Sequence, residues 1–464
     1  MNDILTLSLC QLSERLQHRE LSPLETVNAC LGRIEETETQ LNAYVKVLPE
    51  SARAAARQAE AEIAAGQWKG PLHGVPVAVK DLYDMAGLAT TASSRQRSDW
   101  IAKADSAVVA RLKAAGAIIV GKTHTHEFAY GIVTPTTRNP WDPRCTPGGS
   151  SGGSGATVAS GGAFMAMGTD TGGSIRIPAS VCGTVGLKPT YGRVSRAGVT
   201  SLSWGLDHAG PLTRTIEDAA ICMQVLAGHD PRDPGSLDQP VPDFSADLHK
   251  GVKGLRIGIP TNYFFDNVNS EVEAAVRAAY QKLEALGARL VQVAMPMPEQ
   301  ITPLHFAILL PEASVYHRQM LRETPELYNE DVRLFLEAGE MISATDYIRA
   351  QRVRNVLIKE FERLYEQVDV LVAPSVATTA VPADTETVTW DDGTEEPLVS
   401  AYTRLALPAD LTGQPSLSVP CGFSTEGLPI GFQIIGRPLD EKTVLRVGAA
   451  YQASTDWHQK HPRI

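Results

Sequence analysis

Cysteine is scarce in this sequence, and the few cysteines present stand far apart. There are six, and no C-x-x-C pair occurs among them. Isolated thiols of this kind are typical of reduced side chains in a cytoplasmic protein, not of a disulfide framework or a zinc site. The sequence therefore predicts no bound metal and favours a cytoplasmic location.

Basic residues and long apolar runs are also in short supply. Lys and Arg number 42 against 53 Asp and Glu, giving a formal net charge of −11. This balance argues against a dedicated nucleic-acid-binding protein, which needs a basic surface. The longest uncharged run, residues 145–169, holds eight glycines and is unsuited to a membrane span. The first residues carry an acid and no basic segment, so we expect no secretory signal.

Glycine is abundant in one part of the chain. Of 38 glycines, 14 fall within residues 148–198, where an even distribution would place about four. Apolar runs interrupt the cluster, which argues against a flexible linker. Two Gly/Ser turns, at residues 148–154 and 170–174, are either ordinary glycine turns or a functional site. Successive small residues there would let backbone amides approach an anion or an oxyanion.

Short apolar runs alternate with helical patterns along the chain, which predicts a layered α/β fold. Residues 156–167 are predicted to be either a strand or a helix. A loop is expected to begin at Gly121. Residues 236–250 are expected to form a domain boundary or a long surface loop. Helices are expected at residues 22–36, 51–65, 106–115, 270–286, 344–365 and 441–452. Strands are expected at residues 74–81, 117–120, 255–259, 289–293, 368–372, 416–419 and 430–435.

Three familiar motifs occur without the setting that their chemistry needs. Residues 116–123 match a P-loop, but the four central residues are apolar and read as a strand. His124 and His126, with the adjacent Glu127, suggest a metal site, yet no further ligand stands at suitable spacing. Residues 148–152 match G-x-S-x-G, but three prolines in residues 139–147 exclude the strand that a nucleophile elbow requires.

The glycine-rich core resembles the amidase signature family. The resemblance rests on residues 148–195, which run from GGSSGGSGATVAS to TDTGGSIRIPASVCGTVGLKPTYGRVS, and on four flanking segments. It implies an α/β fold with one large mixed β-sheet covered by helices on both faces, and a single domain over residues 1–464. Within it we expect a helical portion (1–65), the signature core (70–200) and a variable substrate-shaping region (236–400). The flanking segments are residues 70–94, 116–131, 369–375 and 411–422.

The resemblance also implies a Ser–cis-Ser–Lys triad. By motif, the base is Lys80, the bridging serine after a cis peptide is Ser150, and the nucleophile is Ser174, with Ser151 as the nearest alternative bridge. Lysine acts as a base only when neutral, and Lys80 ends an apolar strand where burial would favour that state. The other implied site residues are the oxyanion amides of Thr171, Gly172, Gly173 and Ser174, the supporting Asp170 and Arg176, and the substrate contacts Tyr130, Gly131 and Gly149.

Family members of this kind include stand-alone amidohydrolases and the glutaminase-type A subunit of the tRNA-dependent amidotransferase. That glutaminase carries an acid where an ungapped alignment places Thr403, and an Asn where this chain has Asp410. These departures favour a stand-alone serine amidohydrolase of small amides or carbamates (urethanes), with an acyl-enzyme and no cofactor. We expect a monomer or homodimer that binds neither nucleic acid nor membrane.

Overall fold

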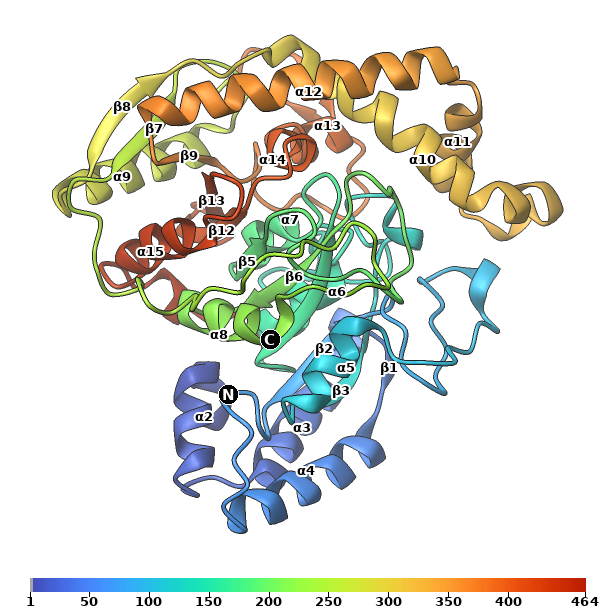
Figure 1. Cartoon of the computed structure of the whole chain (residues 1–464), viewed down its shortest axis with the longest axis vertical. Helices are drawn as coiled ribbons and strands as arrows, with labels where there is room; N and C mark the ends of the chain where they lie inside the picture. Colours follow the sequence, from blue (N-terminus) through green and yellow to red (C-terminus); the bar gives the residue numbers. More distant parts are fainter. Residues whose placement is uncertain (1–2) are drawn as a thin grey trace.

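One large β-sheet runs through the structure, a computed structural model that describes residues 3–464 (Figure 1). Its 11 strands lie in the order β1-β3-β2-β4-β6-β5-β12-β13-β9-β7-β8, and a separate hairpin holds β10 and β11. Both parallel and antiparallel neighbours occur. The strands are β1 (Tyr44–Val47), β2 (Pro76–Lys80), β3 (Ile118–Thr123), β4 (Met165–Asp170), β5 (Val185–Lys188), β6 (His208–Thr213), β7 (Arg256–Pro260), β8 (Arg289–Val293), β9 (Val370–Pro374), β10 (Thr387–Thr389), β11 (Glu395–Pro397), β12 (Ser416–Phe423) and β13 (Pro429–Gly436).

Helices cover the sheet on both faces, which confirms the expected fold class. One sheet thus includes strands from residue 44 to residue 436. The helices are α1 (Asp3–Thr6), α2 (Leu9–Gln17), α3 (Pro23–Leu41), α4 (Pro49–Ala64), α5 (Ala107–Ala114), α6 (Gly152–Ser160), α7 (Arg176–Cys182), α8 (Ile216–Leu226), α9 (Ser270–Ala285), α10 (Ile301–Glu323), α11 (Glu330–Glu340), α12 (Ala344–Gln367), α13 (Leu398–Thr403), α14 (Leu407–Leu411) and α15 (Glu441–Gln452).

The alternation of side chains along β2 determines where Lys80 points. Val77 and Val79 belong to the hydrophobic cluster that includes buried residues of α5, α8 and α15. Ala78 belongs to a different cluster, which includes residues of α3, α4 and α6. Because side chains alternate along a strand, Lys80 lies on the same face as Ala78, toward α6. The glycine-rich turn at the start of α6 is therefore its neighbour.

Most of the predicted helices and strands are present, with local corrections. The prediction of a loop from Gly121 is wrong, because β3 continues to Thr123, with Lys122 buried in an ion pair with Asp81 at 2.7 Å. The ambiguous run 156–167 divides into the end of α6 and the start of β4. Residues 236–250 contain neither helix nor strand, in agreement with the surface-loop alternative.

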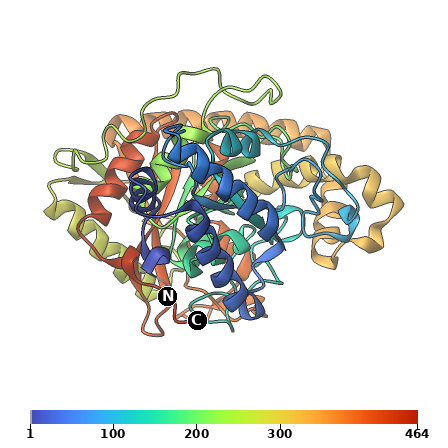
Figure 2. The same cartoon turned by 90° about the horizontal axis from the view of Figure 1, so that it is seen from below.

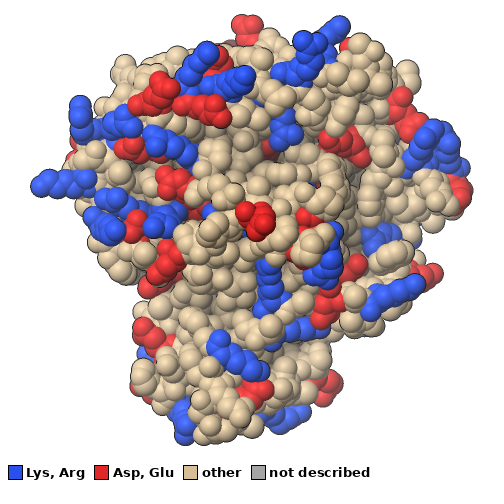
Figure 3. Space-filling view, in the orientation of Figure 1, with Lys and Arg blue, Asp and Glu red and all other residues tan. Residues whose placement is uncertain are grey.

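Helices α10, α11 and α12 form a layer at the edge of the molecule, far from the N-terminal helices α2 to α4 (Figure 1). The first described residues lie beside the C-terminal end of the chain, as Figure 2 shows from below. Acidic and basic side chains are interspersed over the face shown in Figure 3. None of the helices within residues 3–464 combines the length and apolar character needed to cross a membrane.

Gly210 in β6 tests how tightly the central sheet is packed. A Cβ at this position would lie 2.1 Å from Leu187 O, a backbone atom that has little room to move. We expect Gly210→Ala to lower the free energy of unfolding by about 1–3 kcal/mol. The matched control is Gly32→Ala in α3, where a Cβ meets nothing within 4 Å and the helix gains stability. Equal urea midpoints for the two variants would contradict the packing described here.

Candidate active site

Lys80 lies at the end of β2 and is completely buried. Its Nζ is within hydrogen-bond distance of three hydroxyl oxygens: Ser150 Oγ at 2.8 Å, Ser151 Oγ at 2.9 Å and Thr169 Oγ1 at 2.8 Å. Within residues 3–464, no carboxylate forms an ion pair with this amine. The sheet and the turn before α6 thus hold a lysine among neutral partners.

The surroundings of Lys80 favour its neutral form. Burial lowers the pKa of Lys80 well below 10.5, and the more distant charges of Asp170 and Asp207 offset only part of that effect. A neutral amine offers two N–H donors and one lone pair. Three hydroxyl partners match that capacity when two of them accept and one donates.

The hydroxyl of Ser151 is one of the two acceptors. Ser151 Oγ donates its single proton to Thr169 O at 3.2 Å and accepts from Thr169 N at 3.2 Å. With that proton committed, Ser151 can only accept from Lys80. Ser150 Oγ has no partner other than Lys80 in the described part of the chain, so its proton is available to the amine. The geometry therefore favours Ser150 over Ser151 as the bridging serine.

The peptide bond between Gly149 and Ser150 is cis, and the carbonyl of Ser150 in the next peptide is held from two sides. Ser150 O accepts from His126 N at 3.0 Å and from Thr134 Oγ1 at 3.1 Å. Gly149 packs so closely that a Cβ there would lie 2.7 Å from Val133 N. Gly149 does not line the pocket at Ser174 described below, and its expected substrate contact stays a prediction.

Ser174 follows β4 and is the most accessible member of the group, with 6% of its surface exposed. Ser151 N donates to Ser174 O at 3.2 Å, which ties the two Gly/Ser turns together. Among residues 3–464, no hydrogen bond joins Ser174 Oγ to Ser150 Oγ. Catalytic hydrogen bonds are often long in unliganded enzymes and shorten when substrate binds. The structure thus brings Lys80 and Ser150 into contact and places Ser174 beside them.

Asp170 closes the turn that carries Ser174. Its carboxylate accepts from Gly173 N at 2.7 Å, Ile175 N at 3.0 Å and Arg176 N at 3.3 Å. The Gly173 amide is therefore already engaged, and its expected place in the oxyanion hole stays a prediction. The amides of the other three expected residues donate to no group within residues 3–464; they are Thr171, Gly172 and Ser174.

Arg176 holds Asp170 in place from the interior. Its guanidinium donates to both Asp170 oxygens, at 3.0 and 3.1 Å, and to Asp410 Oδ2 at 2.7 Å, with all three side chains fully buried. Burial alone would raise the pKa of Asp170, but the Arg176 guanidinium holds it well below its ordinary value. Burial and the neighbouring Asp170 raise the pKa of Asp410 well above its ordinary value. These contacts hold the turn together, and the supporting roles expected for Asp170 and Arg176 stay a prediction.

A small pocket of about 60 Å³ opens onto Ser174. Tyr130 and Gly131 line it, and Phe335 stacks on Tyr130 with ring centroids 5.4 Å apart. Burial lowers the pKa of His305 to about 4, so no lining side chain carries a charge near neutral pH. The lining residues are Ala129, Tyr130, Gly131, Ile132, Thr171, Gly172, Ser174, Leu202, His305, Phe306, Leu309, Phe335, Val399 and Thr403.

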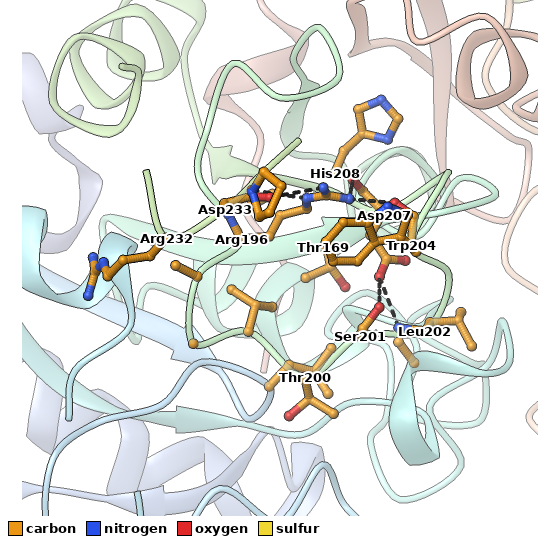
Figure 4. Close-up of a pocket in the computed structure, with 17 residues that line it drawn as sticks. Thr169, Arg196, Thr200, Ser201, Leu202, Trp204, Asp207, His208, Arg232 and Asp233 are labelled. Atoms are coloured by element: carbon orange, nitrogen blue, oxygen red, sulfur yellow. Dashed lines mark hydrogen bonds and ion pairs between the residues drawn. The ribbon is translucent and has the colours of Figure 1, made fainter. Parts of the chain in front are cut away.

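A second cavity of about 230 Å³ reaches Thr169 (Figure 4). It shares Ala129 and Leu202 with the pocket at Ser174, so the two adjoin. Asp207 lies in its wall and accepts from Thr171 Oγ1 at 2.8 Å, which anchors the catalytic turn from this side. The pocket at Ser174 thus meets the turn that carries the expected nucleophile, and the second cavity reaches Thr169, which precedes that turn.

The H-x-H-E segment serves the fold. His126 Nε2 lies 2.9 Å from Asp331 Oδ2 on α11, and Glu127 accepts from Ser94 Oγ and from Asn329 N at 2.8 Å. These contacts connect the Tyr130 loop to α11. Across residues 3–464, no cluster of three or more His, Cys, Asp or Glu side chains could hold a metal ion.

Two residues close to Lys80 and to the turn that carries Ser174 were not predicted from the sequence. Thr169 contacts Lys80, and its place directly before Asp170 in the signature was the available signal. His305 contacts Thr171 from α10, 134 residues away, and nothing in the local sequence indicated this.

The sequence and the fold both match known amidases. Residues 25–445 match the model of the Amidase family. The chain is 57% identical to an amidase of Pseudomonas putida, covering 100% of this chain and 99% of that protein. It is 42% identical to the A subunit of the glutamyl-tRNA(Gln) amidotransferase of Roseiflexus castenholzii, covering 100% and 99%. A bacterial aryl acylamidase structure superposes with a TM-score of 0.90 at 29% identity, covering 98% and 99%.

The mixed sheet, with a buried lysine against a Gly/Ser turn, thus defines a hydrolase acting on amides. The chain belongs to the amidase family, the amidase signature enzymes. The family resemblance seen in the sequence is therefore confirmed.

Asp170→Asn tests the contact that closes the catalytic turn. The substitution leaves Arg176 buried with a weaker partner, so we expect the free energy of unfolding to fall by about 3–5 kcal/mol. Glu50→Gln is the control, because its ion pair with Arg53 lies at the surface, where 89% of the Glu50 side chain is exposed. Thermal unfolding of both variants checks this, and a normal melting temperature for Asp170→Asn would contradict the bracing role.

Proposed function

We propose that the protein is a stand-alone serine amidohydrolase that cleaves the C–N bond of small, uncharged amides or carbamates. The observation that carries the proposal is the buried amine of Lys80, which contacts the hydroxyl of Ser150 beside Ser174. A neutral lysine and a bridging hydroxyl provide a base for serine without histidine. No cofactor is required for this chemistry.

The proposed reaction starts with proton transfer away from Ser174. Ser150 gives its proton to the Lys80 lone pair and accepts the proton of Ser174, while Ser151 and Thr169 accept from the two N–H bonds of the amine. Ser174 Oγ then attacks the substrate carbonyl carbon. The oxyanion forms near the unengaged amides of Gly172 and Ser174, which would stabilise its charge.

The proton that Lys80 has accepted is then returned, through Ser150, to the leaving amine. As the tetrahedral intermediate collapses, the C–N bond breaks, and Ser150 passes a proton from Lys80 to the departing nitrogen. Water attacks the acyl-enzyme by the reverse route and releases the acid, or the carbonic acid monoester when the substrate is a carbamate. Lys80 and Ser150 return to their starting protonation states.

The character of the pocket favours an uncharged substrate over glutamine. Free glutamine carries an α-ammonium and an α-carboxylate, and both need charged or strongly polar partners when they leave water. The pocket offers aromatic and aliphatic side chains, with Thr403 in its wall where the glutaminase of the amidotransferase has an acid. The alternative function is that of the A subunit of the tRNA-dependent amidotransferase. The residues that line the pocket argue against this alternative.

We further propose that the enzyme acts in the cytoplasm as a monomer or homodimer and that the chain forms a single domain. Its six cysteines are all free thiols, five of them buried. Free thiols agree with a reducing compartment.

Covalent labelling tests whether Ser174 is the nucleophile. Treating the purified protein with phenylmethylsulfonyl fluoride should add one sulfonyl group to Ser174, as read by intact mass and peptide mapping. Ser174→Ala should acquire no adduct and lose hydrolysis, while it remains folded. An adduct on another serine, or none on active protein, would overturn the assignment.

Replacing Lys80 tests the base. Lys80→Met should slow acylation by orders of magnitude, because removing the base leaves Ser174 a weak nucleophile. The control is Lys113→Met, at a lysine whose side chain is 46% exposed. Since Lys80 must be neutral, kcat/KM of the wild type should fall as pH drops through its lowered pKa. Near-normal turnover by a folded Lys80→Met protein would exclude the proton relay.

A substrate panel separates the two functions. We expect the chain alone to hydrolyse short apolar amides, anilides or carbamates with a kcat/KM well above that for glutamine, because the pocket lacks charged partners. Released amine and released ammonia are the readouts. A clear preference for glutamine, or activity only with added protein partners, would favour the amidotransferase function.

A further inference from the structure

Helix α10 contacts the catalytic turn through the side chain of His305. The residue lies in the variable region, is 3% exposed, and has its Nε2 3.0 Å from Thr171 O. A Cβ added to Gly172 would lie 3.3 Å from the same ring, so the imidazole is in close contact with this peptide. The proposed reaction, as described so far, assigns no task to it.

The partner of His305 determines its tautomer. A carbonyl oxygen only accepts, so Nε2 must carry the proton that it donates to Thr171 O. Nδ1 then has no proton, and it has no hydrogen-bond partner in the described part of the chain. Burial lowers the pKa of His305 to about 4, so the ring is neutral near neutral pH. His305 is therefore a neutral donor in a single orientation.

The carbonyl that His305 holds belongs to the Thr171–Gly172 peptide. A trans peptide is planar, with its C=O and N–H on opposite sides, so holding the oxygen also orients the Gly172 N–H. That N–H has no acceptor within residues 3–464, and Gly172 lines the pocket together with Ser174. On the other side of the turn, Asp207 holds the Thr171 side chain at 2.8 Å. Thr171 is thus anchored through both its carbonyl oxygen and its side chain.

We propose that His305 is a positioning residue, which orients the Gly172 amide toward the oxyanion formed on attack by Ser174. The inference rests on the proposed function, since it concerns the oxyanion of that same reaction. A donor that is already aimed needs no reorganisation when charge develops. Helix α10 thereby connects the variable region of the chain to the rate of the chemical step.

Three variants separate positioning from packing. His305→Phe keeps a ring but removes the donor, His305→Gln restores an N–H donor, and Ile308→Ala removes a buried side chain from the same helix outside the pocket lining. Each is assayed for kcat and KM with the best substrate of the panel, for melting temperature, and for inhibition by a trifluoromethyl ketone, whose adduct carries the oxyanion.

We expect His305→Phe to lower kcat about 10- to 100-fold with little change in KM, since loss of a whole oxyanion donor costs about 10²–10³. The inhibition constant should rise in parallel, and His305→Gln should recover most of both losses. Ile308→Ala should melt earlier and keep its kcat.

A normal kcat for His305→Phe, or equal losses in the Phe and Gln variants that follow their melting temperatures, would overturn the positioning role. Failure of the proposed function has a different signature: the wild type itself would hydrolyse no amide or carbamate and would form no Ser174 adduct.

Discussion

The carboxylate of Asp170 is the group on which the geometry of the site depends. It accepts from three backbone amides around Ser174 and pairs with the guanidinium of Arg176, in complete burial. A charge in that position is stable only with such partners, because each ion loses its hydration. The turn is consequently rigid, and its remaining amides keep one direction. Asp207 and His305 then hold the next peptide of the same turn from two sides.

The second constraint is the burial of a lysine among hydroxyl groups. The end of β2 directs Lys80 toward α6, and no carboxylate within residues 3–464 pairs with it there to stabilise its charged form. Desolvation therefore outweighs the more distant acids and favours the neutral amine, the form that the proposed base requires. Ser151 donates its only hydroxyl proton to Thr169 O. Of the two serines, Ser150 is therefore the one whose hydroxyl proton is available to the amine. The proposed serine chemistry without histidine depends on this distribution of protons.

Much of the site was predictable, because its parts lie in short contiguous motifs. The signature places Ser150, Asp170, Ser174 and Arg176 within one stretch of chain, and the strand before Lys80 is a plain apolar run. Other features depend on tertiary contacts that no local pattern encodes. His305 arrives from α10, and the engagement of the Gly173 amide depends on the orientation of the Asp170 carboxylate. Lys122 extends β3 where a loop was expected, because a buried partner compensates its charge.

The account depends most on Lys80 being neutral in the folded protein. Protein labelled with ¹³C at the lysine ε-carbon, compared with the Lys80→Met variant, assigns the Lys80 resonance by NMR. We predict that at about pH 8 this resonance has the shift of a free amine, whereas ordinary lysines remain charged there. A Lys80 resonance that stays in the charged form and titrates with the surface lysines would contradict the proposed mechanism.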